Sequence, residues 1–284
     1  MSKQRLFWIH VLISLGLVTL AVLLHFTLDS LLTPLSSTYA SETMYAAEDS
    51  FRESPDGVWQ SSTLSIRRVD QTLTSSGAIS IIQGGLHVNS ASGEVIFENF
   101  GMYGVDRRTR QNLPGYGDVE RTSQFLFPLH VQYATYEYWD PMFIGSRTAT
   151  FDHTENLNGL KVYVFHFTGT GMDETDGYSD MRDVPERYDA HTDGQGLLWV
   201  EPVSGTVVDY EEQGVSYFVD TTSGERMADF HEWKSRYTPE TRAAQLALAR
   251  AAHTKHLALE LWLPGGLLLV SLLSLWVCLW RYKS

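Results

Sequence analysis

The chain has 284 residues, of which 43% are hydrophobic and 12% aromatic, so it has the apolar side chains that a folded core needs. Its 34 Asp and Glu outnumber its 21 Lys and Arg, which argues against binding to nucleic acid, because phosphate binding needs clustered cations. The single cysteine excludes a disulfide scaffold.

Two segments at opposite ends of the chain have the composition of membrane-spanning helices. Residues 6–28 and 261–280 contain no Asp, Glu, Lys or Arg, and about 20 such residues cross the hydrocarbon core of a bilayer as a helix. A cleaved signal peptide is the alternative for the first segment, but the apolar core of a signal peptide is normally about 7–15 residues long. We therefore expect an uncleaved transmembrane anchor at 6–28 and a second transmembrane helix at 261–280.

The charged flanks of these segments predict their orientation. The tail 1–5 contains Lys3 and Arg5, the tail 281–284 contains Arg281 and Lys283, and neither tail contains an acidic residue. Because positively charged flanks remain in the cytoplasm, we expect both termini there. The chain is then a cell-membrane protein with two spans, and its acidic middle part is extracytoplasmic.

The middle part reads as a tether followed by a β-rich domain. Residues 29–58 are rich in Ser, Thr and Asp without a sustained period, which is typical of a tether. From residue 59 to 237, runs of β-branched and aromatic residues alternate with Gly, Asn, Asp and Ser clusters, which favours an antiparallel sheet of hairpins and meanders. The expected fold is a membrane-anchored β-rich (α+β) domain between two transmembrane helices. The expected strands are 61–69, 78–88, 94–105, 125–139, 160–168, 196–201, 206–210, 215–220 and a last one from 225 to 233.

A helix is predicted between this domain and the second span, over residues 238–260. Thr238 can cap it, Pro239 suits its first position, and Glu240 lies in its first turn. Residues 240–261 are rich in Ala, Leu and Arg, which are strong helix formers. We expect this juxtamembrane helix to lead directly into the second span.

Residues 173–180 place four acidic side chains around Gly177. Such carboxylates bind hard cations in some loops, but the spacing is not that of an EF-hand, so a solvated acidic loop is the simpler interpretation. The sequence also lacks a Gly-x-Ser-x-Gly elbow, a phosphate-binding glycine loop and a His-Glu-x-x-His motif. We therefore expect neither a metal site, nor a cofactor, nor an enzyme.

Residues 125–141 form the richest aromatic segment of the chain, with six Phe, Tyr and Trp side chains. Aromatic side chains at this density pack a core or line a cavity for a hydrophobic ligand. Core packing is the default, and a ligand cavity is the alternative for a domain that is tied to lipid at both ends.

Five segments in order along the chain resemble the bacterial PorA-type porin family, much of which is classified as a domain of unknown function. They are 103–109 (YGVDRRT), 127–129 (FPL), 136–140 (YEYWD), 159–165 (GLKVYVF) and 200–205 (VEPVSG). The Asp-Arg-x-Thr and Tyr-Trp-Asp elements are the most specific. The motif positions taken as candidate ligand or site residues are Asp106, Arg107, Thr109, Tyr136, Tyr138, Trp139 and Asp140.

The resemblance implies an envelope protein with a large extracytoplasmic domain, and the family label hints at channel activity. It transfers no catalytic residue, and the simplest roles are a turn-stabilising one for Asp106 and a core role for Trp139. A transmembrane barrel needs strands of about ten residues that alternate apolar and polar side chains, whereas these strands lie between two plain apolar helices. Two helices could line a pore only in an oligomer.

The leading hypothesis is a non-enzymatic envelope membrane protein whose β-domain binds a lipid-like hydrophobic ligand or a protein partner. An oligomeric, porin-like channel component is the first alternative, with a homo-oligomer as the assembly. An envelope hydrolase that uses Asp106 or Asp140 as a general base is the second, and it requires a cleft and a carboxyl group with a raised pKa. The expected partners are the lipid bilayer and the ligand, protein partner or further copies named above. Binding to nucleic acid is not expected.

Overall fold

The structure, a computed structural model, describes residues 3–32, 34–118, 120–140, 145–179 and 184–283. The chain divides into two compact units. One is a helical unit of Met1–Pro34 and Arg250–Ser284, and the other is a sheet unit of Leu35–Ala249. The two units differ in whether their polar or their apolar side chains are exposed.

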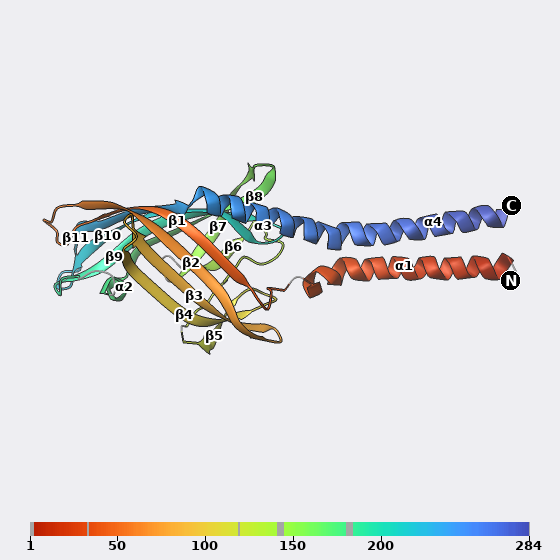
Figure 1. The fold of residues 1–284 in the computed structure, drawn as a ribbon, viewed down its shortest axis with the longest axis horizontal. Helices are drawn as coiled ribbons and strands as arrows, with labels where there is room; N and C mark the ends of the chain where they lie inside the picture. The colour runs from red at the N-terminus through yellow and green to blue at the C-terminus, as the bar shows by residue number, and fades with distance from the viewer. Residues whose placement is uncertain (1–2, 33, 119, 141–144, 180–183, 284) are drawn as a thin grey trace. The chain divides into compact units, whose positions relative to one another are not determined.

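The sheet unit contains one antiparallel sheet of eleven strands (Figure 1). Their order is β5-β4-β3-β2-β1-β11-β10-β9-β8-β7-β6, so the chain forms two meanders that meet where β1 pairs with β11. The strands are β1 (Ala40–Phe51), β2 (Gln60–Ser76), β3 (Ile79–Ser90), β4 (Val95–Asp106), β5 (Asn112–Gly117), β6 (Thr135–Asp140), β7 (Gly145–Leu157), β8 (Leu160–Asp173), β9 (Tyr188–Glu201), β10 (Thr206–Asp220) and β11 (Arg226–Tyr237).

The two edges of this sheet are joined at Gln124. Gln124 forms an antiparallel bridge with Gln111, next to β5, and a parallel bridge with Tyr138 of β6. Its backbone N–H donates to the carbonyl of Glu137 at 2.8 Å, and its carbonyl accepts from Trp139 at 3.0 Å. At this point the sheet therefore closes on itself as a barrel.

The inner face of the sheet is apolar and filled. Phe127, which is fully buried, stacks on Tyr138 of β6 with ring centroids 5.4 Å apart and lies 5.0 Å from the ring of Phe165 of β8. Tyr45 of β1 and Ile66 of β2 belong to the same buried cluster, so side chains from both meanders meet inside. Alternation along each strand leaves most polar residues on the outer face, while a few, such as Asp49 and Asp70, are buried inside.

The sheet unit also contains helical residues at two places. The short helix α2 (Thr175–Ser179) begins after Asp173, whose carboxylate accepts from the backbone N–H and the hydroxyl of Thr175. The helix α3 (Pro239–Leu257) is capped by Thr238, whose hydroxyl accepts from the backbone N–H of Thr241 at 3.2 Å. In its first half Leu246 and Ala249 cover Val162, Val208 and their neighbours on the outer face of the sheet.

The helical unit pairs α1 (Lys3–Leu32) with α4 (Leu263–Lys283), which follows a π-helical turn η1 (Ala258–Trp262). Ser14 and Ser271 are buried between the helices, and each hydroxyl donates to the other residue's carbonyl, at 3.2 and 3.1 Å. His10 bonds Ser274 at 3.1 Å. Phe7–Thr27 and a stretch within Pro239–Arg281 are long and apolar enough to cross a membrane.

The large antiparallel sheet and the two apolar terminal helices confirm the coarse fold prediction, but two details of it are wrong. Residues 40–51, expected in the tether, form β1 in the middle of the sheet, because Ser and Glu face outward while small or aromatic residues such as Ala47 and Phe51 face inward. Residues 125–134, expected as a strand, run along the inside of the sheet instead. There Pro128 interrupts the strand pattern, His130 has a φ of 55°, and the backbone N–H of Val131 donates to the carbonyl of Pro202.

Candidate functional site

The Asp-Arg-x-Thr motif forms the turn between β4 and β5. Asp106 Oδ1 accepts from the backbone N–H groups of Arg108 and Thr109, both at 2.8 Å. Burial acts to raise the pKa of Asp106, but these amide hydrogen bonds outweigh it and the pKa is lowered. Arg107 donates to the carbonyls of Leu35 and Gly77, so it ties the start of the sheet unit to the β2–β3 turn. This geometry makes Asp106 a weak base and gives the hydrolase alternative no support.

The Tyr-Trp-Asp motif lies on β6, against the filled interior. Tyr136 and Tyr138 both pack on the ring of Phe127. The side chain of Asp140 lies outside the described residues, although the residue ends β6. The structure therefore separates the candidates, with Asp106, Arg107 and Thr109 at a surface turn and the aromatic ones at the core.

Trp139 borders a buried polar cluster. Arg121 lies 3.8 Å over the ring of Tyr103 and 5.4 Å from that of Trp139, and burial lowers the pKa of Arg121. The hydroxyl of Tyr103 donates to Asp70, which pairs with Arg68 at 2.7 Å. Burial and then the Asp70 carboxylate raise the pKa of Tyr103. These contacts fix the charges inside the barrel, and we assign them a structural role.

The acidic segment 173–180 is only partly a loop. Asp173 caps α2, and the hydrogen bonds from Thr175 lower the pKa of Asp173. Asp180 lies outside the described residues. The Asp173 carboxylate is therefore occupied by the helix N-terminus, and the solvated-loop interpretation of the segment gives way to a helix cap.

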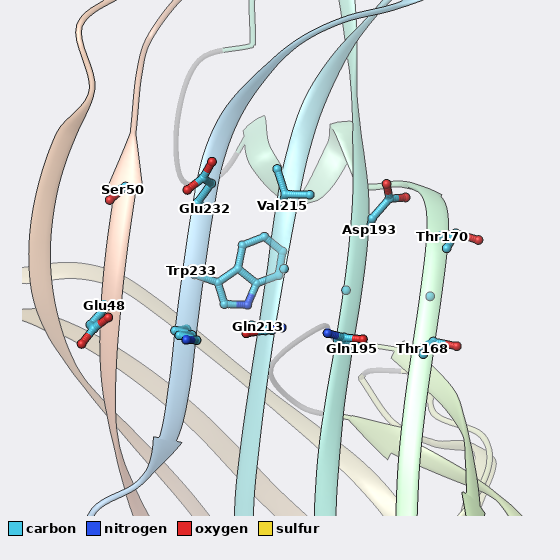
Figure 2. A pocket seen from close by; sticks show the side chains of 14 residues that line it. Glu48, Ser50, Thr168, Thr170, Asp193, Gln195, Gln213, Val215, Glu232 and Trp233 are labelled. Carbon is cyan, nitrogen blue, oxygen red and sulfur yellow. The ribbon is translucent and has the colours of Figure 1, made fainter.

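A different surface has the form of a binding site, namely a groove on the outer face of β1, β11, β10, β9 and β8. It consists of two overlapping depressions of about 590 and 670 Å³. Figure 2 shows how side chains from these neighbouring strands line the first depression. We call this surface the polar groove and define it by the side chains that line both depressions: Glu48, Thr168, Gln195, Gln213 and Lys234.

Strand register brings the polar groove together. Glu48 faces Lys234 across β1 and β11, Lys234 faces Gln213 across β11 and β10, and Gln213 faces Gln195 across β10 and β9. Thr168 of β8 is the register partner of Gln195 and ends the row. All five side chains are exposed, and within the described part of the chain none of them forms a hydrogen bond or an ion pair. Their polar atoms can therefore bind a partner without breaking an internal contact.

A row of glycines runs beside the polar groove. Gly169, Gly194 and Gly214 are register partners on β8, β9 and β10, and Trp233 of β11 is opposite Gly214. A Cβ atom on Gly214 would lie 2.3 Å from Cζ2 of Trp233, so the indole packs directly on the glycine backbone. Trp233 alternates with the exposed Glu232 and Lys234, and its ring lies 5.1 Å from that of His231, so the indole and the glycine row cover the inner face of the sheet behind the first depression.

Charges at one end of the groove are held in place. Asp193 accepts from the backbone N–H of Gly171 at 2.8 Å and pairs with Arg226 at 3.0 Å. Burial acts to raise the pKa of Asp193, but the Gly171 amide and Arg226 outweigh it, so the pKa is lowered. Arg226 in turn lies 3.6 Å over the ring of Tyr217. This end of the groove is therefore a rigid, ionised rim.

Sequence reasoning did not find the polar groove. Each of its residues lies 18 to 120 positions from the next one along the chain, and only the strand order brings them together. The available signal was the position of Gln195 and Gln213 next to glycines, just before the expected strands 196–201 and 215–220. These residues can be recognised as neighbours only when the pairing register of the strands is known.

Comparison with known proteins identifies the family. The model of the family described as Porin PorA matches residues 11–280, which is nearly the whole chain. The chain belongs to the Porin PorA family. The resemblance inferred from the five sequence segments is thereby confirmed.

Similarity of the Porin PorA chain to other proteins is distant. No curated protein matches it. Three solved structures show low similarity to it. An exported protein with a YmcC-like fold from Bacteroides fragilis is 9% identical over 72% of this chain and 97% of its own, with a TM-score of 0.31. A DUF1329 family protein from Desulfovibrio piger is 10% identical over 78% and 91%, with a TM-score of 0.19. DynF, from the dynemicin biosynthesis pathway of Micromonospora chersina, is 9% identical over 73% and 85%, also with a TM-score of 0.19.

Proposed function

We propose that this Porin PorA family member is a non-enzymatic envelope protein, anchored in the cell membrane by α1 and α4, whose sheet unit binds a polysaccharide strand in the polar groove. Both termini are cytoplasmic in this proposal, and the sheet unit is extracytoplasmic. The observation that carries it is the row of five exposed polar side chains that have no side-chain partner among the described residues.

The chemistry of the row suits hydroxyl groups. A Gln amide donates and accepts at once, a carboxylate accepts from two hydroxyls, and an ammonium donates to several oxygens. Gln195 and Gln213 lie side by side, with Glu48 and Lys234 continuing the row. A sugar ring presents adjacent hydroxyls that act as both donors and acceptors, so one strand can bond to successive members.

The anchoring part of the proposal rests on the polarity of the helical unit. Its exposed side chains include Leu12, Leu15 and Trp276, each more than 60% exposed, while serines are buried between the helices. Small polar residues at the contact and large apolar residues outside are typical of helices that pack in lipid. The cations of both tails favour cytoplasmic termini.

Other functions receive less support. The interior, which a lipid-like ligand would occupy, is filled by side chains around Phe127. A pore, which the family name suggests, needs a sheet with an apolar outer face, whereas Glu48, Glu232 and Lys234 are exposed on the outer face here. A protein partner at the polar groove is kept as an outcome of the experiment.

Binding by the intact protein in detergent or nanodiscs tests the proposal. Photo-crosslinking groups at positions 195 and 213 should capture glycan from native membranes, and the double variant Gln195→Ala/Gln213→Ala should bind isolated envelope polysaccharide at least about tenfold more weakly, since two bonds of about 1 kcal/mol are removed. The matched control is Gln71→Ala/Gln83→Ala, which removes two exposed glutamines from β2 and β3, outside the groove.

Three results are informative here. Capture of glycan with loss only in the groove variant supports the proposal. Capture of a protein at the same positions would mean that the polar groove binds a protein partner and not a polysaccharide. Equal polysaccharide binding by both double variants rejects the groove as the site.

A further inference from the structure

A continuous chain of short hydrogen bonds crosses the inside of the sheet unit beneath α2. Asp49 of β1 contacts Nε2 of His231 of β11 at 2.6 Å, and Nδ1 of the same imidazole contacts the hydroxyl of Tyr178 of α2 at 2.6 Å. From there the chain continues to Ser216 and Thr192.

The second half of the chain ends on another carboxylate. Tyr178 contacts the hydroxyl of Ser216 at 2.6 Å, and Ser216 contacts the hydroxyl of Thr192 at 2.7 Å. Thr192 bonds the carboxylate of Glu174 at 2.8 Å. Ser216 and Thr192 are fully buried and Tyr178 is 3% exposed, so water does not substitute for these bonds.

This chain of hydrogen bonds has one proton too few when His231 is neutral and both carboxylates are ionised. Its five contacts need five protons, because each contact requires a donor on one side. A neutral imidazole and three hydroxyls supply four, and two ionised carboxylates supply none. A contact of 2.6–2.8 Å without a proton would place two lone pairs against each other inside the protein, which is costly.

A bound proton completes the chain in either of two ways. As an imidazolium, His231 donates to Asp49 and to Tyr178, and the hydroxyls then donate in sequence toward Glu174. Alternatively, Glu174 holds the proton and donates to Thr192, every hydroxyl bond reverses, and neutral His231 accepts from Tyr178 and still donates to Asp49. Both arrangements contain the same atoms and have the same net charge, and each hydroxyl exchanges one proton for another as they interconvert.

Charged groups also flank the hydrogen-bond chain. The guanidinium of Arg147 of β7 lies 3.6 Å from the Glu174 carboxylate. Among the described residues, the titratable and charged groups in and beside the chain include Asp49 on β1, Glu174 and Tyr178 at α2, His231 on β11 and Arg147 on β7.

We propose that Asp49, His231, Tyr178, Ser216, Thr192 and Glu174 form a proton-binding site that holds α2 across the interior of the sheet while one proton is bound. Release of that proton breaks one of the five contacts and loosens α2, because Tyr178 is the member that α2 contributes. The inference is independent of the polar groove, which lies on the opposite face of the sheet.

Hydrogen exchange of the intact protein measures this directly. The reporter is the backbone N–H of Tyr178, which donates to the carbonyl of Glu174 at 2.9 Å in the closed α2. If the closed site binds one proton more than the opened one, protection of this amide, corrected for its intrinsic exchange rate, should fall tenfold per pH unit above about pH 6.5, where an exposed imidazole is already neutral. Protection should be flat at lower pH, until the carboxylates themselves become protonated.

Two variants make the proton count falsifiable. Glu174→Gln places a permanent N–H donor at the end of the chain, so all five contacts are satisfied at every pH and the slope should vanish. Thr192→Val shortens the chain to three contacts that neutral His231, Tyr178 and Ser216 satisfy alone, so its slope should also vanish, though protection is lower throughout. Glu225→Gln is the matched control, an exposed glutamate outside the chain, and should keep the parental slope.

The outcomes separate cleanly. A slope of one proton in the parent that both chain variants abolish supports the site. Flat protection of the Tyr178 amide in the parent between about pH 6.5 and 9, or an unchanged slope in Glu174→Gln, overturns it.

Discussion

The helical unit and the sheet unit distribute polarity in opposite ways. Between α1 and α4 the buried contacts include Ser14 and Ser271, while leucines and tryptophans are exposed. In the sheet unit Phe127 is fully buried, while Glu48 and Lys234 are exposed. Both patterns are explained by the solvent that suits the exposed side chains, because an apolar exterior is stable in lipid and a polar exterior is stable in water. The strands therefore have the pattern expected in water, and the helices have the length and composition of membrane-spanning segments.

The largest expected effect follows from emptying the inner face of the sheet. Phe127→Ala removes a ring that packs on Tyr136, Tyr138 and Phe165, and we expect it to lower the free energy of unfolding by about 3–5 kcal/mol. Denaturant titration of the intact protein measures this. Phe100→Ala, where the ring is 53% exposed, should cost about 1 kcal/mol or less. Equal losses would show that the inner face is not the core.

The second prediction concerns Gly214, in the glycine row beside the polar groove. Gly214→Ala places a methyl group 2.3 Å from Cζ2 of Trp233, so the indole must move, at a cost of about 1–3 kcal/mol. Displacement of Trp233 should shift its fluorescence emission. Gly177→Ala, where no atom lies within 4 Å of the new methyl group, should leave the emission unchanged. Identical spectra for the two variants would mean that Trp233 does not rest on Gly214.

A third change tests the polarity of the helical unit. Ser14→Ala removes one of the two reciprocal hydrogen bonds between α1 and α4 and should weaken their pairing by about 0.6 kcal/mol, the usual value for such bonds in membranes. Disulfide trapping between introduced cysteine pairs, measured in bilayers, reports the pairing. Leu12→Ala, at a side chain 65% exposed, should have no effect on trapping. A larger loss from Leu12→Ala would place the helix contact on the other face.

The smallest expected effect is a pH dependence at the β4–β5 turn. Because the pKa of folded Asp106 lies below its ordinary 3.8, the carboxylate stabilises the fold above that pH, and the contribution is lost as pH falls through the lowered value. Asp106→Asn keeps an oxygen for the two amides, so its melting temperature should fall less than that of the parent on acidification below about pH 4. Melting curves at a series of pH values test this, and parallel falls would reject it.

Much of the fold could be predicted from the sequence because the signals were local. The absence of charge over 6–28 and 261–280 predicted the two apolar helices, and Gly205 and Gly224 marked hairpin turns that the structure contains, both with positive φ. The strand at 40–51 was missed because its inner residues include Ala47 and Asp49, which lack the β-branched pattern, and pairing on both sides supplies the stability instead.

The site could not be predicted because its members become neighbours only through register. Glu48, Gln195 and Lys234 come from three strands in different parts of the chain. The motif residues were easier to find, since Asp106, Arg107 and Thr109 act within one turn, but local motifs of this kind report on backbone geometry more readily than on function. The same limit applies to His231 and Glu174, which are linked through three strands and a helix.

The main-chain bridges at Gln124 affect how copies of the protein can associate with one another. An open sheet with two unpaired margins would offer each margin as a template to neighbouring copies, and crowding would favour their stacking. Here Gln124 supplies main-chain partners to Glu137 and Trp139 on one margin, and its neighbours Ser123 and Phe125 do so for Asn112 and Arg110 on the other. Deleting one residue from this linker should break these main-chain pairings and favour association between copies through the freed strand edges.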